Sequence, residues 1–458
     1  MATVLQRTGS GAYYGKMTIS FWVKRSKLGE QGIFGRREGS ATANLSTCHF
    51  GGDDSLLINF RDGGGTSKYY MITDRLFRDV GAWYHIVFAI DGTHATASER
   101  SKLYVNGVRE TSFQLLNNPS STGYEVNMFV GGSYNTYIGR GLKSQTDTWL
   151  TFEGCMSHFH CSTGYTYDAD VFGSTDSVTG EWKIKNPTFT PGTDGFTVLK
   201  DGNTITDQSA NSNNFTVYSG TLTKTEDCPS NVFCTLNPLS PQTYTFSNGN
   251  NTIVRASGTG QSTAVGTLAV NSGKYYWEVK LNSGQSDYPR IGIFAMNKDN
   301  HVYTTYLGNH GGGSGKWWGS GGTSSSNKKI QDGNGTAIQF YPYDNGDILM
   351  FALDCDNEKV WFGKNGTWYT NDNSTTTTGT AISNNTATPA FSNVSNTEMW
   401  TPAVFGNASG DNWSCNFGNG YFGTTAISSE GTNASGNGIF EYDVPTGFTA
   451  LSTKGLNL

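Results

Sequence analysis

The chain has 458 residues with 59 glycines; 13% of its residues are aromatic, only 15% are charged, and the formal net charge is −6. Intrinsic disorder requires few aromatic and many charged residues, so this composition excludes it and favours an ordered, loop-rich, all-β protein. The scattered basic residues form no run that could follow a phosphate backbone, and no apolar run approaches the roughly 20 residues that span a bilayer. We therefore expect neither nucleic-acid binding nor membrane insertion.

The amino-terminal residues 1–7 lack the hydrophobic core of a signal peptide, so we do not expect Sec-type secretion. The number of cysteines is odd, which disfavours a disulfide framework, and no two of them are spaced as C-x-x-C, which disfavours a zinc site. We expect most of them to be reduced and structural. The cysteines are Cys48, Cys155, Cys161, Cys228, Cys234, Cys355 and Cys415.

The first strong strand signal covers residues 17–24, where Ile19, Phe21 and Val23 alternate with other side chains. This period of two predicts a half-buried strand. Asn106 and Gly107 lie between two strand-like runs and predict a tight hairpin. Short strands at this spacing are typical of a β-sandwich. Further strands are predicted at residues 56–60, 83–90, 102–105 and 128–131.

The first half of the chain resembles laminin-G-like, concanavalin-A-like jelly rolls. The resemblance is carried, in the expected order, by residues 19–24, 81–87, 103–108, 137–140 and 152–156. Many such domains open with a strand followed by a D-S-S-G-N-G-N-like turn, whereas here the corresponding residues 196–200 and 207–214 come at the end. We interpret this as a permuted order, in which the strand near residue 196 completes a first sandwich that spans residues 1–225.

The second half resembles the SPRY module over residues 243–424. The motifs are G-x-Y-Y-W-E-V at residues 273–279, G-D-x-[IL]-x-x-A-L-D at 346–354 and W-F-x-x-N-G-x-W at 361–368. SPRY modules are also two-sheet sandwiches. The expected fold is therefore all-β, with two tandem antiparallel jelly-roll-like β-sandwiches, the concanavalin-A-like laminin-G type first and the SPRY type second.

The segments outside the two sandwiches complete the expected domain organisation. Residues 226–242 are predicted to be a linker, and residues 425–458 a carboxy-terminal tail. Phe440, Tyr442 and Phe448 in that tail are expected to pack back on the second sandwich. The order of a laminin-G-like half, a SPRY-like half and a tail resembles that of virion proteins predicted in the genomes of tailed phages, especially marine ones. This resemblance implies a location on the virion more than a biochemical activity.

The motifs of several common hydrolases are missing from the sequence. The E-x-D-x-x-E pattern of jelly-roll glucanases is absent, because Glu441 and Asp443 lack the second glutamate, and neither G-x-S-x-G nor H-E-x-x-H occurs. His158 and His160 lie beside Cys155 and Cys161 and could in principle ligate a metal, but they are also typical of a decorated sheet face. We expect no enzymatic activity and name no metal ligands among them.

Calcium is the cofactor that the resemblance brings into question, because many laminin-G-like domains carry Ca²⁺ at the sandwich rim. Asp53 and Asp54 after two glycines, and Asp91 at a strand end, are the loop carboxylates that could contribute. Aspartate is also a common turn former, and this alternative is left open. No cofactor is otherwise expected.

Aromatic side chains in loops are the best candidates for ligand binding, because a ring offers an apolar platform to a sugar face. Two adjacent tryptophans on a strand point to opposite faces, so at most one is expected in a core. In the SPRY resemblance Trp368 falls at a position that usually packs the sandwich, so a structural role is the alternative there. The candidates are Trp317, Trp318, Tyr341, Tyr343, Trp368 and Tyr369.

The leading functional hypothesis is a non-enzymatic phage virion structural protein, exposed on the capsid or tail and assembled in the host cytoplasm. Its expected partners are host-surface glycan, other virion proteins, or both, and it could form a homo-oligomer. One rival is a tail-spike polysaccharide depolymerase, which needs two carboxylates roughly 5 to 9.5 Å apart. The other is a purely architectural capsid decoration protein.

Overall fold

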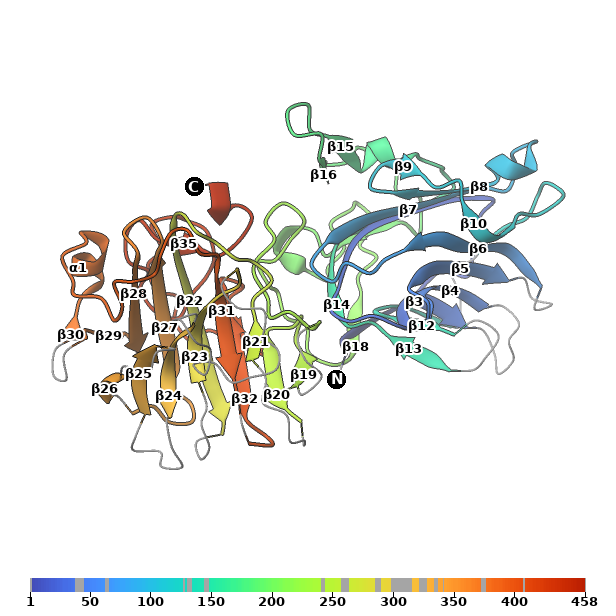
Figure 1. Ribbon diagram of the computed structural model, residues 1–458. Helices are drawn as coiled ribbons and strands as arrows, with labels where there is room; N and C mark the ends of the chain where they lie inside the picture. Colours follow the sequence, from blue (N-terminus) through green and yellow to red (C-terminus); the bar gives the residue numbers. More distant parts are fainter. Residues whose placement is uncertain are drawn as a thin grey trace. The chain divides into compact units, whose positions relative to one another are not determined.

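The computed structural model divides the chain into two compact units (Figure 1). The first comprises Met1–Lys224 with Cys228–Ser230, and the second comprises Thr225–Asp227 with Asn231–Leu458. The structure describes residues 2–37, 45–61, 66–126, 128–129, 134–143, 148–239, 244–256, 263–284, 290–297, 315–320, 328–332, 337–340, 342–371, 376–406 and 408–457.

The first unit contains a large antiparallel sheet with the strand order β10-β6-β5-β4-β3-β11-β1-β18 in the described part of the chain. Its strands are β1 (Val4–Thr8), β3 (Gln31–Arg37), β4 (Leu45–Phe50), β5 (Ser55–Arg61), β6 (Ser67–Leu76), β10 (Phe113–Asn117), β11 (Asn135–Ile138) and β18 (Thr216–Ser219).

The opposing sheet of the first unit has the order β17-β14-β2-β7-β8-β9. The late strand β17 pairs with β14, with Phe159 opposite Val198. The strands are β2 (Lys16–Arg25), β7 (Trp83–Asp91), β8 (Ser101–Val105), β9 (Val108–Arg109), β14 (Gly154–Thr163) and β17 (Phe196–Val198).

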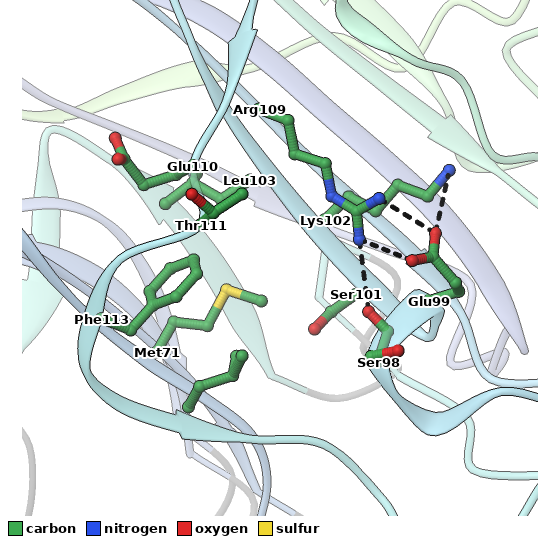
Figure 2. Close-up of a pocket in the computed structure, with 11 residues that line it drawn as sticks. Met71, Ser98, Glu99, Ser101, Lys102, Leu103, Arg109, Glu110, Thr111 and Phe113 are labelled. Carbon is green, nitrogen blue, oxygen red and sulfur yellow. Dashed lines mark hydrogen bonds and ion pairs between the residues drawn. The ribbon is translucent and has the colours of Figure 1, made fainter.

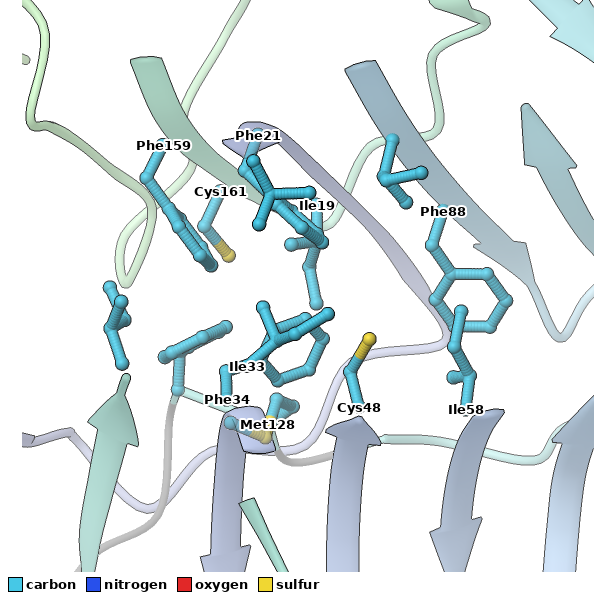
Figure 3. Packing of buried hydrophobic residues seen from close by; sticks show 14 of the residues in the cluster. Ile19, Phe21, Ile33, Phe34, Cys48, Ile58, Phe88, Met128, Phe159 and Cys161 are labelled. Atoms are coloured by element: carbon cyan, nitrogen blue, oxygen red, sulfur yellow. The ribbon is translucent and has the colours of Figure 1, made fainter. Parts of the chain in front are cut away.

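Side chains from the two sheets meet in a single apolar core (Figure 3). Phe21 on β2 stacks on Phe159 of the same sheet at 5.1 Å between ring centroids and meets Phe34 of the opposing sheet edge-on at 5.9 Å. Such offset and edge-on contacts add to the free energy of burying the rings. This core explains the alternation in β2, because Ile19, Phe21 and Val23 all point into it.

The prediction that β2 is half-buried is wrong, because its other face is covered too. Thr18 and Trp22 on that face are buried. The backbone N–H of Tyr167 donates to Thr18, and the hairpin of β15 (Gly173–Thr175) and β16 (Trp182–Ile184) lies nearby, with Trp182 bonded to His85 on β7. The alternation identified the inner face but held no information about the segment that covers the outer one.

The predicted hairpin at Asn106 and Gly107 is confirmed. Val105 pairs with Val108, and φ is 48° at Asn106 and 79° at Gly107. A two-residue turn with positive φ at both positions matches the right-handed twist of the strands that it joins. Asparagine and glycine adopt that conformation at little cost, which is why this pair predicts it.

The second unit is built on two further sheets, with the orders β19-β20-β32-β22-β27-β28-β29-β30 and β21-β31-β23-β24-β25-β26 in the described residues. The first is formed by β19 (Tyr244–Ser247), β20 (Thr252–Arg255), β22 (Lys274–Ser283), β27 (Ile348–Asp354), β28 (Lys359–Lys364), β29 (Thr367–Tyr369), β30 (Thr376–Thr377) and β32 (Asn412–Asn416), and β35 (Thr449–Ala450) pairs in parallel with β22. The second is formed by β21 (Thr263–Val265), β23 (Arg290–Ala295), β24 (Gly315–Ser320), β25 (Lys328–Asp332), β26 (Ala337–Phe340) and β31 (Trp400–Phe405).

Both faces of β27 are buried, which accounts for its continuous apolar sequence. Leu349, Phe351 and Leu353 point into the core between the sheets, while Met350 and Ala352 join an outer cluster with Phe440 and Phe448. Phe440 and Phe448 of the carboxy-terminal segment therefore cover the outer face of this strand. The remaining elements are β33 (Tyr421–Phe422), β34 (Thr425–Ala426), α1 (Gly379–Ser383), η1 (Ala97–Glu99), η2 (Ala169–Val171), η3 (Asp201–Asn203) and η6 (Gly455–Asn457).

The segment expected to be a linker is largely part of the second unit. Cys234 and Leu236 are buried in its central core, and Phe233 joins the outer cluster with the tail. The backbone N–H of Cys234 donates to Leu451 and forms part of the attachment. Polar residues around this stretch made it resemble a connector, while its few apolar side chains fix it to the sandwich.

Candidate functional site

The tryptophans expected to form a binding platform are interior residues. Trp317 and Trp318 on β24 point to opposite faces, yet their exposed fractions are 1% and 0%. Trp318 packs in the central core, and Trp317 packs with Phe294 and Phe405 in a smaller cluster on the other face of its sheet. The expectation that at most one of them is core is wrong, because this sheet is covered on both faces here.

Most of the other predicted platform rings are buried as well. Tyr343 and Trp368 have exposed fractions of 0% and 3%, and Tyr369 is half-buried and meets Trp318 edge-on at 5.6 Å. Tyr341 lies outside the described residues. The platform hypothesis is therefore wrong for Trp317, Trp318, Tyr343 and Trp368, since none of these rings presents a face to a ligand.

The carboxylates considered for calcium are occupied by protein groups. Asp54 pairs with Arg25 at 3.0 Å and with Arg78 at 3.3 Å. Asp53 accepts hydrogen bonds from Ser55, and Asp91 pairs with Lys16 at 3.1 Å. Within the described residues, no group of three or more His, Cys, Asp or Glu side chains is arranged to hold a metal ion.

Ser20 and His85 lie in contact on the outer face of the second sheet of the first unit, but the histidine nitrogen that faces the serine carries a proton and cannot act as a base toward it. Trp182 Nε1 donates to His85 Nδ1 at 2.9 Å, so the proton of the neutral imidazole is on Nε2. His85 Nε2 lies 2.9 Å from Ser20 Oγ and therefore donates to it. Burial lowers the pKa of His85 to about 3. This histidine holds the hairpin and does not accept a proton from the serine.

The histidines and cysteines of β14 do not converge on a common point. His160 is buried on the outer face, where its Nδ1 lies 3.0 Å from Thr197 Oγ1 and its ring stacks on Phe172. His158 lies in a bulge with φ of 49°. Cys161 points the opposite way, into the core. This arrangement corresponds to the structural alternative, a decorated sheet face.

A cleft of about 260 Å³ lies at the edge of the first sandwich, between β10 and the β8–β9 hairpin (Figure 2). Met71 and Phe113 line one side, and Glu99, Lys102 and Arg109 form a charged group on the other. Glu99 accepts from Arg109 at 2.9 Å, and this hydrogen bond lowers its pKa. A general acid for sugar cleavage needs a raised pKa, so the geometry does not suit Glu99 to that role.

Partly exposed aromatic rings gather around one arginine on the first unit. We call this group the Arg140 cluster: Tyr137, Arg140, Trp149 and Tyr218. The Arg140 guanidinium carbon lies 3.9 Å from the Trp149 ring centroid, 5.2 Å from that of Tyr137 and 5.6 Å from that of Tyr218. Tyr218 has an exposed fraction of 51%, and the other three side chains are half-buried.

The Arg140 cluster is assembled from strands that are far apart in the sequence. Tyr137 lies on β11 and pairs with Gln6 on β1, while Tyr218 lies on the edge strand β18. Gly139, with φ of 84°, turns the chain from β11 into β12 (Arg140–Leu142), which forms a hairpin with β13 (Trp149–Thr151). A side chain at Gly139 would meet the carbonyl oxygen of Thr3 at 2.4 Å, so only glycine fits this corner.

The β12–β13 hairpin is held against the outer face of the large sheet. Leu142 and Thr47 on β4 exchange two hydrogen bonds, of 3.0 and 2.9 Å. A Cβ atom at Gly32 on β3 would lie 2.1 Å from the backbone nitrogen of Gly141, so the two backbones are in close contact. This packing fixes Arg140 and Trp149 relative to Tyr137.

Sequence patterns contain little indication of this cluster. Tyr137 and Arg140 belong to a segment that carries the laminin-G-like resemblance, and nothing else in the sequence distinguishes them. The alternation of Tyr137 with the buried Ile138 could have placed Tyr137 on an outer face. No spacing in the sequence links these residues to Trp149 or Tyr218, because the crossing of the hairpin over the sheet brings them together.

Comparison with known proteins identifies both domains. Residues 8–158 match the family model of the concanavalin A-like lectin/glucanases superfamily, and residues 274–420 match the SPRY domain. No curated protein matches the chain. Helices long and apolar enough to cross a bilayer are absent from the part of the chain that the structure describes.

Solved structures with local similarity include two SPRY domains and a pentraxin. The SPRY domain of human HERC1 is 17% identical, with 39% of this chain and 96% of that chain covered and a TM-score of 0.29. The TRIM65 PSpry domain is 16% identical, with 40% and 91% covered and a TM-score of 0.28. The heptameric SAP-like pentraxin from Limulus polyphemus is 13% identical, with 44% and 90% covered and a TM-score of 0.28.

The chain is thus an all-β protein with two β-sandwich domains, a concanavalin-A-like domain of the laminin-G type followed by a SPRY domain. The predicted fold class is confirmed. The Arg140 cluster lies in the first unit, and one of its members, Tyr218, comes after the last residue that the first family model matches.

Proposed function

We propose that the chain is a non-enzymatic binding protein that recognises carbohydrate with the Arg140 cluster. The observation that carries this proposal is the half-exposed group of rings at Tyr137, Trp149 and Tyr218 on a concanavalin-A-like domain. The rings of Tyr137 and Trp149 meet edge-on at 5.2 Å, as do those of Tyr137 and Tyr218 at 5.4 Å. Rings fixed at different angles suit the C–H faces of a sugar.

Polar side chains adjacent to the rings support a sugar ligand. Gln6 pairs with Tyr137 across the strands, and Asn135 lies on the same face of β11 as Tyr137. Asn135 Nδ2 donates to Gln6 Oε1 at 3.4 Å. These amides can exchange hydrogen bonds with sugar hydroxyls, since each amide carries both donors and acceptors.

The second part of the proposal concerns where the protein works. The order of a laminin-G-like half, a SPRY-like half and a tail resembles phage virion proteins, and we propose a structural protein exposed on the capsid or tail. Its partners are then host-surface glycan and neighbouring virion proteins. The free cysteines suit assembly in a reducing cytoplasm.

The absence of catalysis is also a proposal, and two geometric features support it. His85 donates to Ser20 and its Nδ1 is occupied by Trp182, so this pair is not an activated nucleophile. In the cleft between β10 and the β8–β9 hairpin, Glu99 pairs with Arg109 and Glu110 with Arg75. The pKa of Glu99 is lowered by this pairing, whereas sugar cleavage needs a carboxylate that carries a proton.

Binding to a glycan array and to purified host polysaccharide tests the first part. Tyr218→Ala should weaken binding about five- to tenfold, since one aromatic contact contributes about 1 kcal/mol. The matched control is Tyr13→Ala, because Tyr13 is 49% exposed and lies outside the Arg140 cluster. Equal binding by the native protein and Tyr218→Ala would contradict the proposed site.

Imaging of intact particles with a labelled antibody tests the second part. We expect the protein on the particle surface, and its presence in host cytoplasm without any on virions would overturn the virion assignment. New reducing ends after incubation with host polysaccharide would instead favour a tail-spike depolymerase. Tight binding to empty capsids without any glycan binding would favour an architectural decoration protein.

A further inference from the structure

We infer that the Arg140 cluster selects an acidic saccharide, with Arg140 pairing a carboxylate on the sugar while the surrounding rings contact its C–H face. The inference rests on the proposed function, because it names the ligand class of the same site. It depends on how the guanidinium of Arg140 is held and on which of its groups remain available.

The environment of Arg140 consists of aromatic faces. Its guanidinium carbon lies within 6 Å of the ring centroids of Trp149, Tyr137 and Tyr218, at 3.9, 5.2 and 5.6 Å. A cation over a ring is attracted by the electron-rich face, and the attraction grows as water is excluded. The Arg140 guanidinium is therefore held over the faces of the rings. The side chain is half-buried and does not extend into solvent.

Three buried arginines of the first unit, Arg7, Arg25 and Arg100, instead donate N–H groups to protein acceptors. Arg7 donates to the carbonyls of Phe129 and Asp194, and Arg25 donates to Asp54 at 3.0 Å and to the carbonyl of Phe77 at 2.7 Å. Arg100 likewise donates to backbone carbonyls. These arginines are structural, because protein acceptors use their donors.

The side chain of Arg140 makes no hydrogen bond or ion pair with any residue in the described part of the chain. A guanidinium has five N–H donors in one plane, and stacking on rings leaves that plane free. The planar fork matches a carboxylate, which it binds through two parallel hydrogen bonds. A charged donor set that is fixed in position and has no acceptor among the described residues is suited to a planar anionic group on the ligand.

The net charge of the chain means that attraction of an acidic saccharide is local to the Arg140 cluster and is not a general attraction of polyanions to the protein. The net charge of the chain is −6, so the protein as a whole repels an acidic polymer. Binding of such a polymer must therefore be specific to a site with a fixed cation. A sugar that carries a carboxylate, a uronic acid, combines an apolar ring face with the planar anion that the cluster fits.

The test is binding of polyuronates, measured by isothermal titration calorimetry and affinity electrophoresis. The probes are polygalacturonate, polyglucuronate and polymannuronate, each compared with the same polymer after reduction of its carboxylates to alcohols. We expect the native protein to bind at least one acidic polymer about tenfold more tightly than its reduced form, because a hydrogen bond to a charged group contributes more than a neutral one.

Three variants separate charge from ring contact. Arg140→Gln should abolish the preference for the acidic polymer, Arg140→Lys should retain part of it, and Tyr218→Ala should weaken binding of both polymers. Arg109→Gln is the control, because Arg109 is a surface arginine paired with Glu99 outside the cluster. Thermal unfolding of each variant shows whether the fold is intact, and Arg140→Lys provides a test if Arg140→Gln fails to fold.

The outcomes distinguish this inference from the function on which it rests. Equal binding of acidic and reduced polymers by the native protein, with weaker binding by Tyr218→Ala, would overturn the acidic ligand and leave carbohydrate binding standing. The same holds if Arg140→Gln keeps the preference. Failure to bind any polyuronate overturns the acidic ligand, and failure on the glycan array as well overturns the proposed function.

Discussion

The buried carboxylate of Glu278 connects the carboxy-terminal segment to the second sandwich. It lies on the face of β22 that the tail covers and accepts hydrogen bonds from the backbone N–H groups of Glu441 at 3.0 Å and Tyr442 at 2.8 Å. Tyr276 Oη and Asn416 Nδ2 donate to it as well, at 2.9 and 3.2 Å. Burial without a cation raises its pKa to about 7, although these hydrogen bonds act in the opposite direction.

The raised pKa of Glu278 predicts a pH dependence of stability. Its ordinary pKa is 4.5, so between pH 4.5 and 7 the folded state binds a proton that the unfolded chain has lost. The contribution of Glu278 to the free energy of unfolding should therefore fall by about 3 kcal/mol as the pH rises through this window. Glu278→Gln should remove that part of the pH dependence, because glutamine does not titrate. Urea unfolding at pH 5, 6 and 7.5 measures the difference between the two proteins.

A second carboxylate serves as the control for this measurement. The pKa of Glu99 is lowered by its hydrogen bond with Arg109, so its titration lies below pH 4.5. Glu99→Gln should leave the slope between pH 5 and 7.5 unchanged. If Glu278→Gln follows the native slope as closely as Glu99→Gln does, Glu278 is not the titrating group.

Residue-level expectations from the sequence held where a side chain's role depends on its neighbours in the chain. Asn106 and Gly107 form the predicted turn. Their tolerance of positive φ depends on the residue type itself and not on what packs against it from elsewhere in the fold. Trp317 failed as a predicted platform, because its exposure depends on what packs against its sheet from elsewhere in the fold. Alternation gives the direction of a side chain but not what covers it.

At the scale of elements, the crossing of β12–β13 over the large sheet determines the candidate site. The hairpin lies on β3 and β4, and glycines at the crossing allow the backbones to touch. Nothing in the sequence predicted this crossing, because glycines are abundant and none is distinguished by its neighbours. The predicted strands therefore described the sheets but not the surface on which the rings gather.

Gly32→Ala should displace the hairpin and weaken the site. Its Cβ atom would lie 2.1 Å from the backbone nitrogen of Gly141 and 2.3 Å from the carbonyl oxygen of Leu150, so the backbones must separate. Overpacking of this kind costs about 1–3 kcal/mol. We expect a lower midpoint of urea unfolding together with weaker carbohydrate binding, since Arg140 and Trp149 move with the hairpin.

Gly52→Ala is the matched control for that substitution. The nearest atom to its added Cβ is Glu30 Cγ at 3.8 Å, which is an ordinary contact. Carbohydrate binding by Gly52→Ala should equal that of the native protein. Native-like binding by a destabilised Gly32→Ala would show that the hairpin does not position the ligand.

A short polar loop recurs in both units and attaches late segments of the chain. Ser209 donates through its backbone N–H and its hydroxyl to Asp207, and Asn211 N–H donates to Ser209 Oγ. Asn433, Ser435 and Asn437 repeat the same three bonds in the second unit. The Asn, Ser and Gly content that suggested only loops thus includes specific anchors, since such side chains satisfy nearby backbone groups.

At the scale of the whole molecule, each unit has its own central core. Two sandwiches could be predicted from the short alternating strands and from the motifs of the two families, because alternation and motifs are both local in sequence. The role of residues 231–236 was not predictable in the same way. Phe233, Cys234 and Leu236 are few among polar neighbours, and their burial depends on contacts with strands far along the chain.

The cysteines provide probes of the two cores at once. Cys48 and Cys161 are buried in the core of the first unit, and Cys234, Cys355 and Cys415 in that of the second. Their thiols should be unreactive in the native protein, since burial raises the pKa of Cys48, Cys161, Cys355 and Cys415 and excludes the reagent. Only the half-buried Cys155 and Cys228 should react before unfolding.

Pulsed alkylation across a urea series, read by mass spectrometry of peptides, tests this expectation. Cys48 and Cys161 should become reactive at one urea concentration, because the two sheets that carry them share one core and separate together. Cys234, Cys355 and Cys415 should likewise become reactive as one group, and reductant should leave both midpoints unchanged because all the cysteines are free thiols. Labelling of Cys48 well before Cys161 would mean that the first sandwich opens sheet by sheet, and would contradict a single cooperative core.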